Sequence, residues 1–166
     1  MQNVIWAMKD IGAAVSRMSD SPIHGIKHWS QVCSNAIMLM QAEQVESVVP
    51  IAFSYLHDCL RENEDEDPKH GERAGSLVLA LKGTLLKYMD HNDVGILANA
   101  CRDHSKGMVI HPICSSKVTG ICWDADRLDL GRPGVGIIPN PAFMSTETGK
   151  ALARKQVNGF AKATIG

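Results

Sequence analysis

Apolar residues recur at helical spacing along most of the chain, and this pattern predicts a succession of amphipathic helices. In the first segment the apolar positions are Val4, Ile5, Met8, Ile11 and Val15. The run from Ser19 to Pro22 should end that helix. A second helix is expected over residues 28–45 and a third from Pro50 to Leu60. The third segment is apolar on nearly every face, so we expect it at the centre of the fold.

The second half of the chain predicts four further helices in the same way. They are expected over residues 69–87, from a cap at Asn92 to His104, over 118–130 and over 146–162. Residues 62–67 contain five acidic side chains, which repel one another and predict a solvated loop. Residues 135–145 are rich in Gly, Pro and Asn and predict a surface loop.

No alternation of period two competes with these helices, so the sequence predicts an all-α fold without a sheet. The chain has 166 residues, 45% of them hydrophobic and 21% charged, which is enough to bury a core. We therefore expect residues 1–166 to form a single-domain helical bundle of about six to seven helices.

Charge and composition exclude several classes of partner. A net charge of -1 provides no basic surface for duplex nucleic acid or an anionic membrane, so an anionic ligand needs a local site.

Residues 1–20 mix apolar with charged positions, unlike a secretion signal, and no window of 18 apolar residues occurs. The five cysteines, which form no C-x-x-C pair, indicate reduced thiols. We expect a soluble protein of the cytoplasm.

Histidines near acidic residues are the main chemical signal in the sequence. The seven histidines are His24, His28, His57, His70, His91, His104 and His111. Most of them lie within one helical turn of an acidic or arginine side chain. Imidazole and carboxylate ligands together suit Mn, Fe, Ni, Co or Zn, whereas Mg or Ca prefers oxygen alone. His91 and His111 are expected in solvent-exposed loops.

Four segments, in order, resemble the HD-domain superfamily of metal-dependent phosphohydrolases, whose signature is H…HD…D. They are "HGIKHWSQV", "LHDCLRENEDEDPKHGERAG", "CRDHSKG" and "CWDADRLDLGRPG", and together they span residues 24–134. The resemblance implies a helical bundle with a divalent transition metal inside it. It assigns His28, His57, Asp58 and Asp124 as the ligands of one ion per chain. Asp126 and Asp129 are interpreted as lying elsewhere on their helix, with Asp126 as a cap or a partner of an arginine.

The resemblance also implies a reaction, in which the ion polarises a phosphoryl oxygen and a bound water of lowered pKa attacks phosphorus. Lys69, Arg73 and Arg127 are expected to meet the transferring charge. Relatives with two ions use two more histidines, but the spacing of His70 and His104 fits that pattern poorly. Both are therefore expected to contact the phosphate or donate a proton beside a single ion.

Two further expectations concern residues around the signature. Some nucleotide phosphohydrolases of this kind use an acid three positions after the doublet, where this chain has Arg61. Glu62, Asp65 and Asp67 are the remaining candidates for a base. His24 lies one helical turn before His28 and is expected to orient it.

The favoured function is hydrolysis of a small phosphorylated molecule, which includes nucleotides. One alternative is an oxygenase with two irons in the same helical frame, as in some relatives with extra histidines. Another is a sensor that binds a nucleotide without turning it over.

Overall fold

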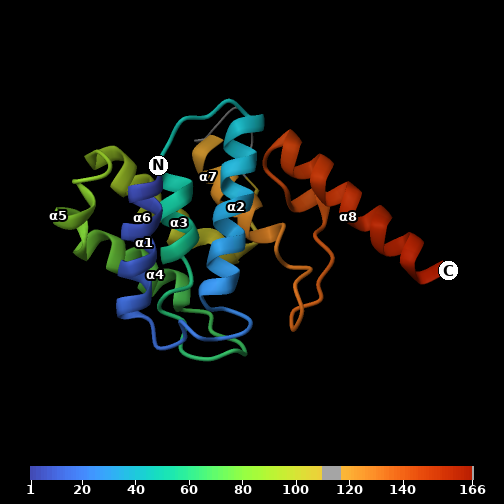
Figure 1. Ribbon diagram of the computed structural model, residues 1–166, viewed down its shortest axis with the longest axis horizontal. Helices are drawn as coiled ribbons and strands as arrows, with labels where there is room; N and C mark the ends of the chain where they lie inside the picture. The colour runs from blue at the N-terminus through green and yellow to red at the C-terminus, as the bar shows by residue number, and fades with distance from the viewer. Residues whose placement is uncertain (110–116, 166) are drawn as a thin grey trace.

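The structure is a computed structural model that describes residues 1–109 and 117–165, and these residues contain helices and no strand (Figure 1). This confirms the expected all-α fold class. The α-helices are α1 (Gln2–Val15), α2 (Ile26–Ala42), α3 (Val49–Leu56), α4 (His70–Ala80), α5 (Lys82–Leu85), α6 (His91–Asp103), α7 (Lys117–Arg127) and α8 (Glu147–Ile165). Two short 3-10 helices are η1 (His104–Lys106) and η2 (Pro141–Phe143).

Helix α3 is the centre of the bundle, as its uniformly apolar sequence predicts. Every residue of α3 is buried, and the helix packs against α1, α2, α6 and α7. Gly12 allows α1 to lie directly on the backbone of α3, because a Cβ atom there would be 2.5 Å from the Tyr55 carbonyl oxygen. The residues that follow α3 are therefore held by packing on several sides.

Helices α4 and α6 pack together through glycines. A Cβ atom on Gly71 would lie 2.8 Å from the Cys101 carbonyl oxygen, and one on Gly75 would lie 2.7 Å from that of Ala98. These approaches are closer than an alanine permits. The first turn of α4 and the last turn of α6 are consequently side by side.

Several helix boundaries differ from the sequence predictions: α2 ends at Ala42 instead of Val45, α7 ends at Arg127 instead of Leu130, and three further differences concern α3, α4 and α6. Helix α3 ends at Leu56 instead of Leu60, and residues 57–59, which follow it, are buried in a non-helical bend and turn. The segment predicted over 69–87 is divided at Leu81 into α4 and α5, and Gly83 weakens helix formation there. The N-cap of α6 is Asp90, whose side chain accepts a hydrogen bond from the Asp93 amide at 2.8 Å.

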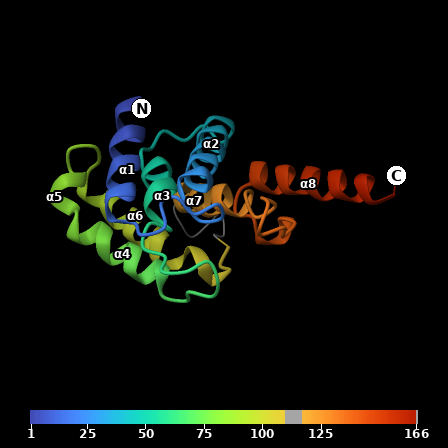
Figure 2. The same ribbon diagram turned by 60° about the horizontal axis from the view of Figure 1, so that its bottom comes forward.

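Helix α8 extends away from the bundle, and both ribbon views show its C-terminal half clear of the other helices (Figures 1 and 2). Its first residues contact α2, α7 and η2. Within the described part of the chain, none of the helices is both long and apolar enough to span a lipid bilayer. The described cysteines are buried and free, as expected, whereas Cys114 and His111 lie outside the described residues.

Candidate metal centre

Five segments bring six histidine and aspartate residues together. They come from the first turn of α2 (His28), the residues after α3 (His57 and Asp58), the start of α4 (His70), the start of η1 directly after α6 (His104) and α7 (Asp126). We call these six residues the HD cluster. The loops 16–25 and 57–69, the second of which contains His57 and Asp58, gather at one end of the bundle (Figure 1).

The first half of the HD cluster contains His28, His57 and Asp126. The Nε2 atoms of His28 and His57 are 3.3 Å apart. Asp126 Oδ1 lies 3.4 Å from the first and 3.6 Å from the second. Asp58 Oδ2 is 3.8 Å from both. Two imidazoles and two carboxylates thus converge on one point.

The second half contains His70 and His104, whose Nε2 atoms are 3.0 Å apart. Asp58 Oδ1 lies 3.3 Å from His70 Nε2 and 3.5 Å from His104 Nε2. Asp58 therefore directs one oxygen to each half. This position suits a carboxylate that bridges two cations.

Hydrogen bonds at the other ring nitrogen fix how the four imidazoles point. The Nδ1 atoms of His57, His70 and His104 donate to the backbone carbonyls of Phe53, Asp67 and Cys101. The Nδ1 of His28 donates to Asp129 Oδ2 at 2.7 Å. Because these oxygens only accept, each neutral ring carries its proton on Nδ1 and directs the Nε2 lone pair into the HD cluster.

This arrangement fits divalent transition metals. Lone pairs that face one another at 3.0 and 3.3 Å repel unless positive charge lies between them. Asp58 Oδ1 is buried without a hydrogen-bond partner among the described residues. A buried polar atom of this kind is costly unless a ligand satisfies it. Histidine nitrogens with carboxylate oxygens are a donor set for Mn, Fe, Ni, Co or Zn.

The electrostatics of the HD cluster also favour bound positive charge. Burial alone would raise the pKa of Asp58, but the imidazoles of His57 and His104 hold it well below its usual range. Burial would lower the pKa of His28, yet hydrogen bonds to Asp126 and Asp129 raise it to about 9, so this ring also carries a proton on Nε2 until a bound ion displaces that proton. Burial would raise the pKa of Asp126, but hydrogen bonds to His28 and His57 hold it well below its usual range. Asp58 and Asp126 thus stay charged, and cations would neutralise them.

The structure corrects the prediction that Asp124 completes the ligand set. Its carboxylate accepts hydrogen bonds from the Ser145 and Thr146 amides, both at 2.7 Å, and from the Thr146 hydroxyl at 2.8 Å. Asp124 therefore anchors the segment that leads into α8. Asp126, which was interpreted as a cap or an arginine partner, takes the place in the HD cluster because it lies on the face of α7 toward His28.

Two arginines expected to meet a phosphate have structural partners instead. Arg127 is buried and donates to the carbonyls of Phe143 at 2.5 Å and Met108 at 2.6 Å. Arg73 donates to the Leu60 carbonyl at 2.9 Å and to Asp67 Oδ2 at 2.5 Å. These contacts hold loops in place, and none of them is with a residue of the HD cluster. Lys69 is exposed at the start of α4.

The candidate bases are also placed differently from expectation. Asp67 is buried, and its Oδ2 accepts from the Glu62 amide at 3.0 Å as well as from Arg73. Glu62 and Asp65 are exposed in the loop. None of these three belongs to the HD cluster.

His24 touches the HD cluster, with its Nδ1 3.3 Å from Asp58 Oδ2. His24 also meets the ring of His28 edge-on, with the ring centroids 6.3 Å apart, so it contacts both Asp58 and His28.

Sequence reasoning missed two residues beside the HD cluster. Asp129 binds His28, and its spacing of three from Asp126 is the signal that both share one side of the chain at the end of α7. Arg61 was considered only as the position of a missing acid. Its Nη1 lies 4.0 Å from Asp58 Oδ1, which makes it the arginine nearest to the second half.

The fold is similar to the crystal structure of a predicted HD superfamily hydrolase from an uncultured Thermotogales bacterium. The TM-score is 0.74 at 23% sequence identity, and the match covers 96% of this chain and 88% of that chain. The two proteins share one fold. This likeness agrees with the resemblance of the four quoted segments to the HD-domain superfamily. No protein-family model matches the chain, and no curated protein sequence matches it.

Proposed function

We propose that the protein is a metal-dependent phosphohydrolase that cleaves a small phosphate ester or nucleotide. The observation that carries this proposal is the shared carboxylate of Asp58, whose two oxygens face two separate groups of imidazole lone pairs. Such an arrangement is suited to a pair of cations, where sequence spacing led us to expect one. The hydrolase-like fold of the structural neighbour supports the same reaction class.

The residues divide between two cation positions. His28, His57, Asp126 and Asp58 Oδ2 would hold the first, and His70, His104 and Asp58 Oδ1 the second. Bound divalent cations supply Lewis acidity, which stabilises charge on a phosphoryl group and makes water a better nucleophile at neutral pH. The protein contributes rigid ligand directions, because backbone carbonyls or Asp129 fix each ring.

Arg61 is the side chain that we assign to the substrate's negative charge. Its Nη2 donates to the Asp65 carbonyl at 2.8 Å and its Nε to that of Asn63 at 3.4 Å, which holds the guanidinium in place. Within the described residues, the contact of Nη1 is the 4.0 Å ion pair with Asp58. This leaves Nη1 able to donate to a phosphate oxygen beside the second position.

Metal analysis followed by a phosphatase panel tests the function. The purified chain should contain transition metal, and phosphorylated compounds should release phosphate when Mn, Ni, Co, Zn or Fe is restored after chelation. Asp126→Asn should lose this release. Phosphate release that survives complete metal removal, or its absence across the panel in the fully loaded protein, would contradict the proposal.

A second candidate is the oxygenase, because His70 and His104 join the HD cluster and complete a set of six residues that could hold two irons. One experiment distinguishes the two functions. Iron-loaded protein that consumes oxygen with an unphosphorylated substrate supports the oxygenase, whereas phosphate release without oxygen uptake supports the phosphohydrolase.

A further inference from the structure

One imidazole of the HD cluster has a different outer partner from the other three. His28 Nδ1 donates to a carboxylate, Asp129 Oδ2, at 2.7 Å, whereas the other three rings donate to neutral backbone carbonyls. A negatively charged acceptor increases the electron density of the ring and makes its Nε2 a stronger ligand. His28 belongs to the first cation position alone.

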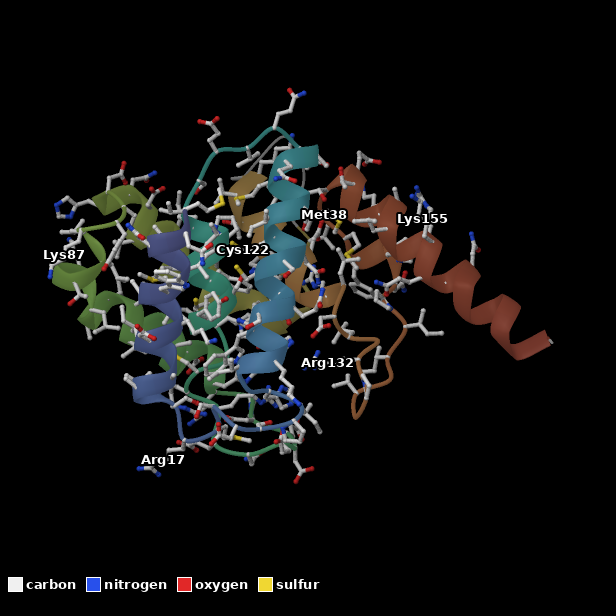
Figure 3. All side chains as sticks on the ribbon, in the orientation of Figure 1. Arg17, Met38, Lys87, Cys122, Arg132 and Lys155 are labelled. Atoms are coloured by element: carbon white, nitrogen blue, oxygen red, sulfur yellow. The ribbon has the colours of Figure 1, made fainter. Side chains whose placement is uncertain are left out.

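Asp129 is itself held firmly. Its carboxylate is largely buried, with 11% of the side chain exposed, and Oδ2 lies 3.7 Å from Arg132 Nη1. Arg132 also donates to the Asp129 carbonyl at 3.0 Å and to the Ile23 carbonyl at 2.9 Å. Figure 3 shows Arg132 between the N-terminal half of α2 and the loop after α7. The Asp129 carboxylate is therefore fixed in position before any ion binds.

Charge is also divided unequally between the two positions. The first has the full carboxylate of Asp126 in addition to its share of Asp58, and Asp129 lies behind it. The second has two imidazoles and its share of Asp58. More negative charge in a buried site means tighter binding of a divalent cation.

Resting on the proposed function, we propose that Asp129 is a positioning residue that makes the first cation position bind its ion more tightly than the second. The two positions then fill in a fixed order. At low metal concentration the protein holds one ion, and the second position exchanges with the surroundings. The complete pair forms only when the metal concentration rises.

Titration of the metal-free protein with Mn²⁺ tests this inference by counting sites and their dissociation constants. The wild type should show two classes of site that differ at least tenfold. Asp129→Asn should weaken the tight class by about 10- to 100-fold and leave the weak class unchanged. Asp129→Glu, which retains the carboxylate, should restore part of the affinity. His70→Asn should remove the weak class alone.

Asp103→Asn is the control for loss of one negative charge near the HD cluster, because Asp103 precedes His104 in the chain and its carboxylate pairs with Lys106 at 2.7 Å. It should leave the tight class unchanged. Two equal sites in the wild type, or a tight class that Asp129→Asn does not weaken, would overturn the inference while the proposed function stands. Absence of Mn²⁺ binding altogether would overturn both. Thermal unfolding of each variant shows whether a lost site reflects a lost fold.

Discussion

Two buried aspartates, Asp58 and Asp124, lie in contrasting surroundings. Asp124 accepts three hydrogen bonds from Ser145 and Thr146, and a Cβ atom on Gly149 would collide with its carboxylate. The protein satisfies this carboxylate completely with its own groups. Asp58 has imidazoles around it, and its Oδ1 is buried without a hydrogen-bond partner among the described residues.

This difference distinguishes a carboxylate that stabilises the fold from one that belongs to a candidate metal site. A buried carboxylate that the fold satisfies with amides stabilises the fold, as at the start of α8. A buried carboxylate that faces imidazole nitrogens, with one oxygen lacking a hydrogen-bond partner, is stabilised further by a bound cation. The sequence resemblance assigned both residues to the H…HD…D signature, so residue type alone does not distinguish them. The hydrogen-bond partners of each carboxylate oxygen distinguish them.

The largest expected effect comes from removing the shared carboxylate. Asp58→Asn should reduce bound metal to below one ion per chain and lower phosphate release by about a hundredfold or more, because both positions lose an oxygen ligand. Metal analysis and phosphate assay measure the two effects. The exposed Asp20→Asn is the control and should change neither. Full metal content in Asp58→Asn would remove the distinction drawn between the two aspartates.

Gly71→Ala should disturb one half of the HD cluster. The new Cβ would meet the carbonyl oxygens of Cys101 at 2.8 Å and Arg102 at 2.9 Å, so α4 must move away from α6 and His70 from His104. We expect loss of the second ion and destabilisation by about 2 kcal/mol. Gly95→Ala, on α6 with open space around it, is the matched control. Two retained ions in Gly71→Ala would show that this packing does not set the metal geometry.

Arg61→Gln should weaken substrate binding without changing metal content. Loss of a charged hydrogen bond to phosphate costs about 1.5–3 kcal/mol, which corresponds to roughly a 10- to 100-fold rise in KM. Steady-state kinetics with the best substrate of the panel measure it. The exposed Arg17→Gln, on the surface near α1, should leave KM unchanged. A KM that Arg61→Gln leaves unchanged would assign the phosphate contact to another group.

Asp124→Asn should affect stability and not the HD cluster. The amides of Ser145 and Thr146 lose a charged acceptor, so we expect destabilisation by about 2 kcal/mol and a fall in Tm of about 4–8 °C. Thermal unfolding of the metal-free protein measures this. An unchanged Tm would show that the carboxylate does not anchor α8.

The smallest expected effect is a pH dependence of folding stability that comes from Glu43. Its side chain accepts from the Thr148 amide and hydroxyl and pairs with Lys117. Burial would raise its pKa, but these contacts lower it to about 2 from 4.5. Its stabilising contribution, about 1 kcal/mol, is therefore complete above pH 4.5 and lost as pH falls toward 2. Urea unfolding of the wild type and Glu43→Gln should differ at pH 7 and converge in acid; a constant difference would contradict this.

The sequence predicted the helices well because their periodicity is a local property. It also selected His28, His57 and Asp58, which meet in the HD cluster. It did not choose correctly between Asp124 and Asp126, since two residues that are two positions apart face opposite sides of α7. Which side faces His28 depends on how α7 packs on α2 and α3. Similarly, Gly71 and Gly75 bring His70 to His104 by a close helix contact that sequence spacing alone does not reveal.

The central claim is that Asp126, and not Asp124, binds metal with His28 and His57. The most direct measurement is the metal content of two matched variants, Asp126→Asn and Asp124→Asn, each loaded with Mn²⁺ and freed of excess metal. Our account predicts that Asp126→Asn loses the tightly held ion, whereas Asp124→Asn retains the wild-type content in its folded fraction. Loss of that ion from Asp124→Asn with full retention by Asp126→Asn would contradict it.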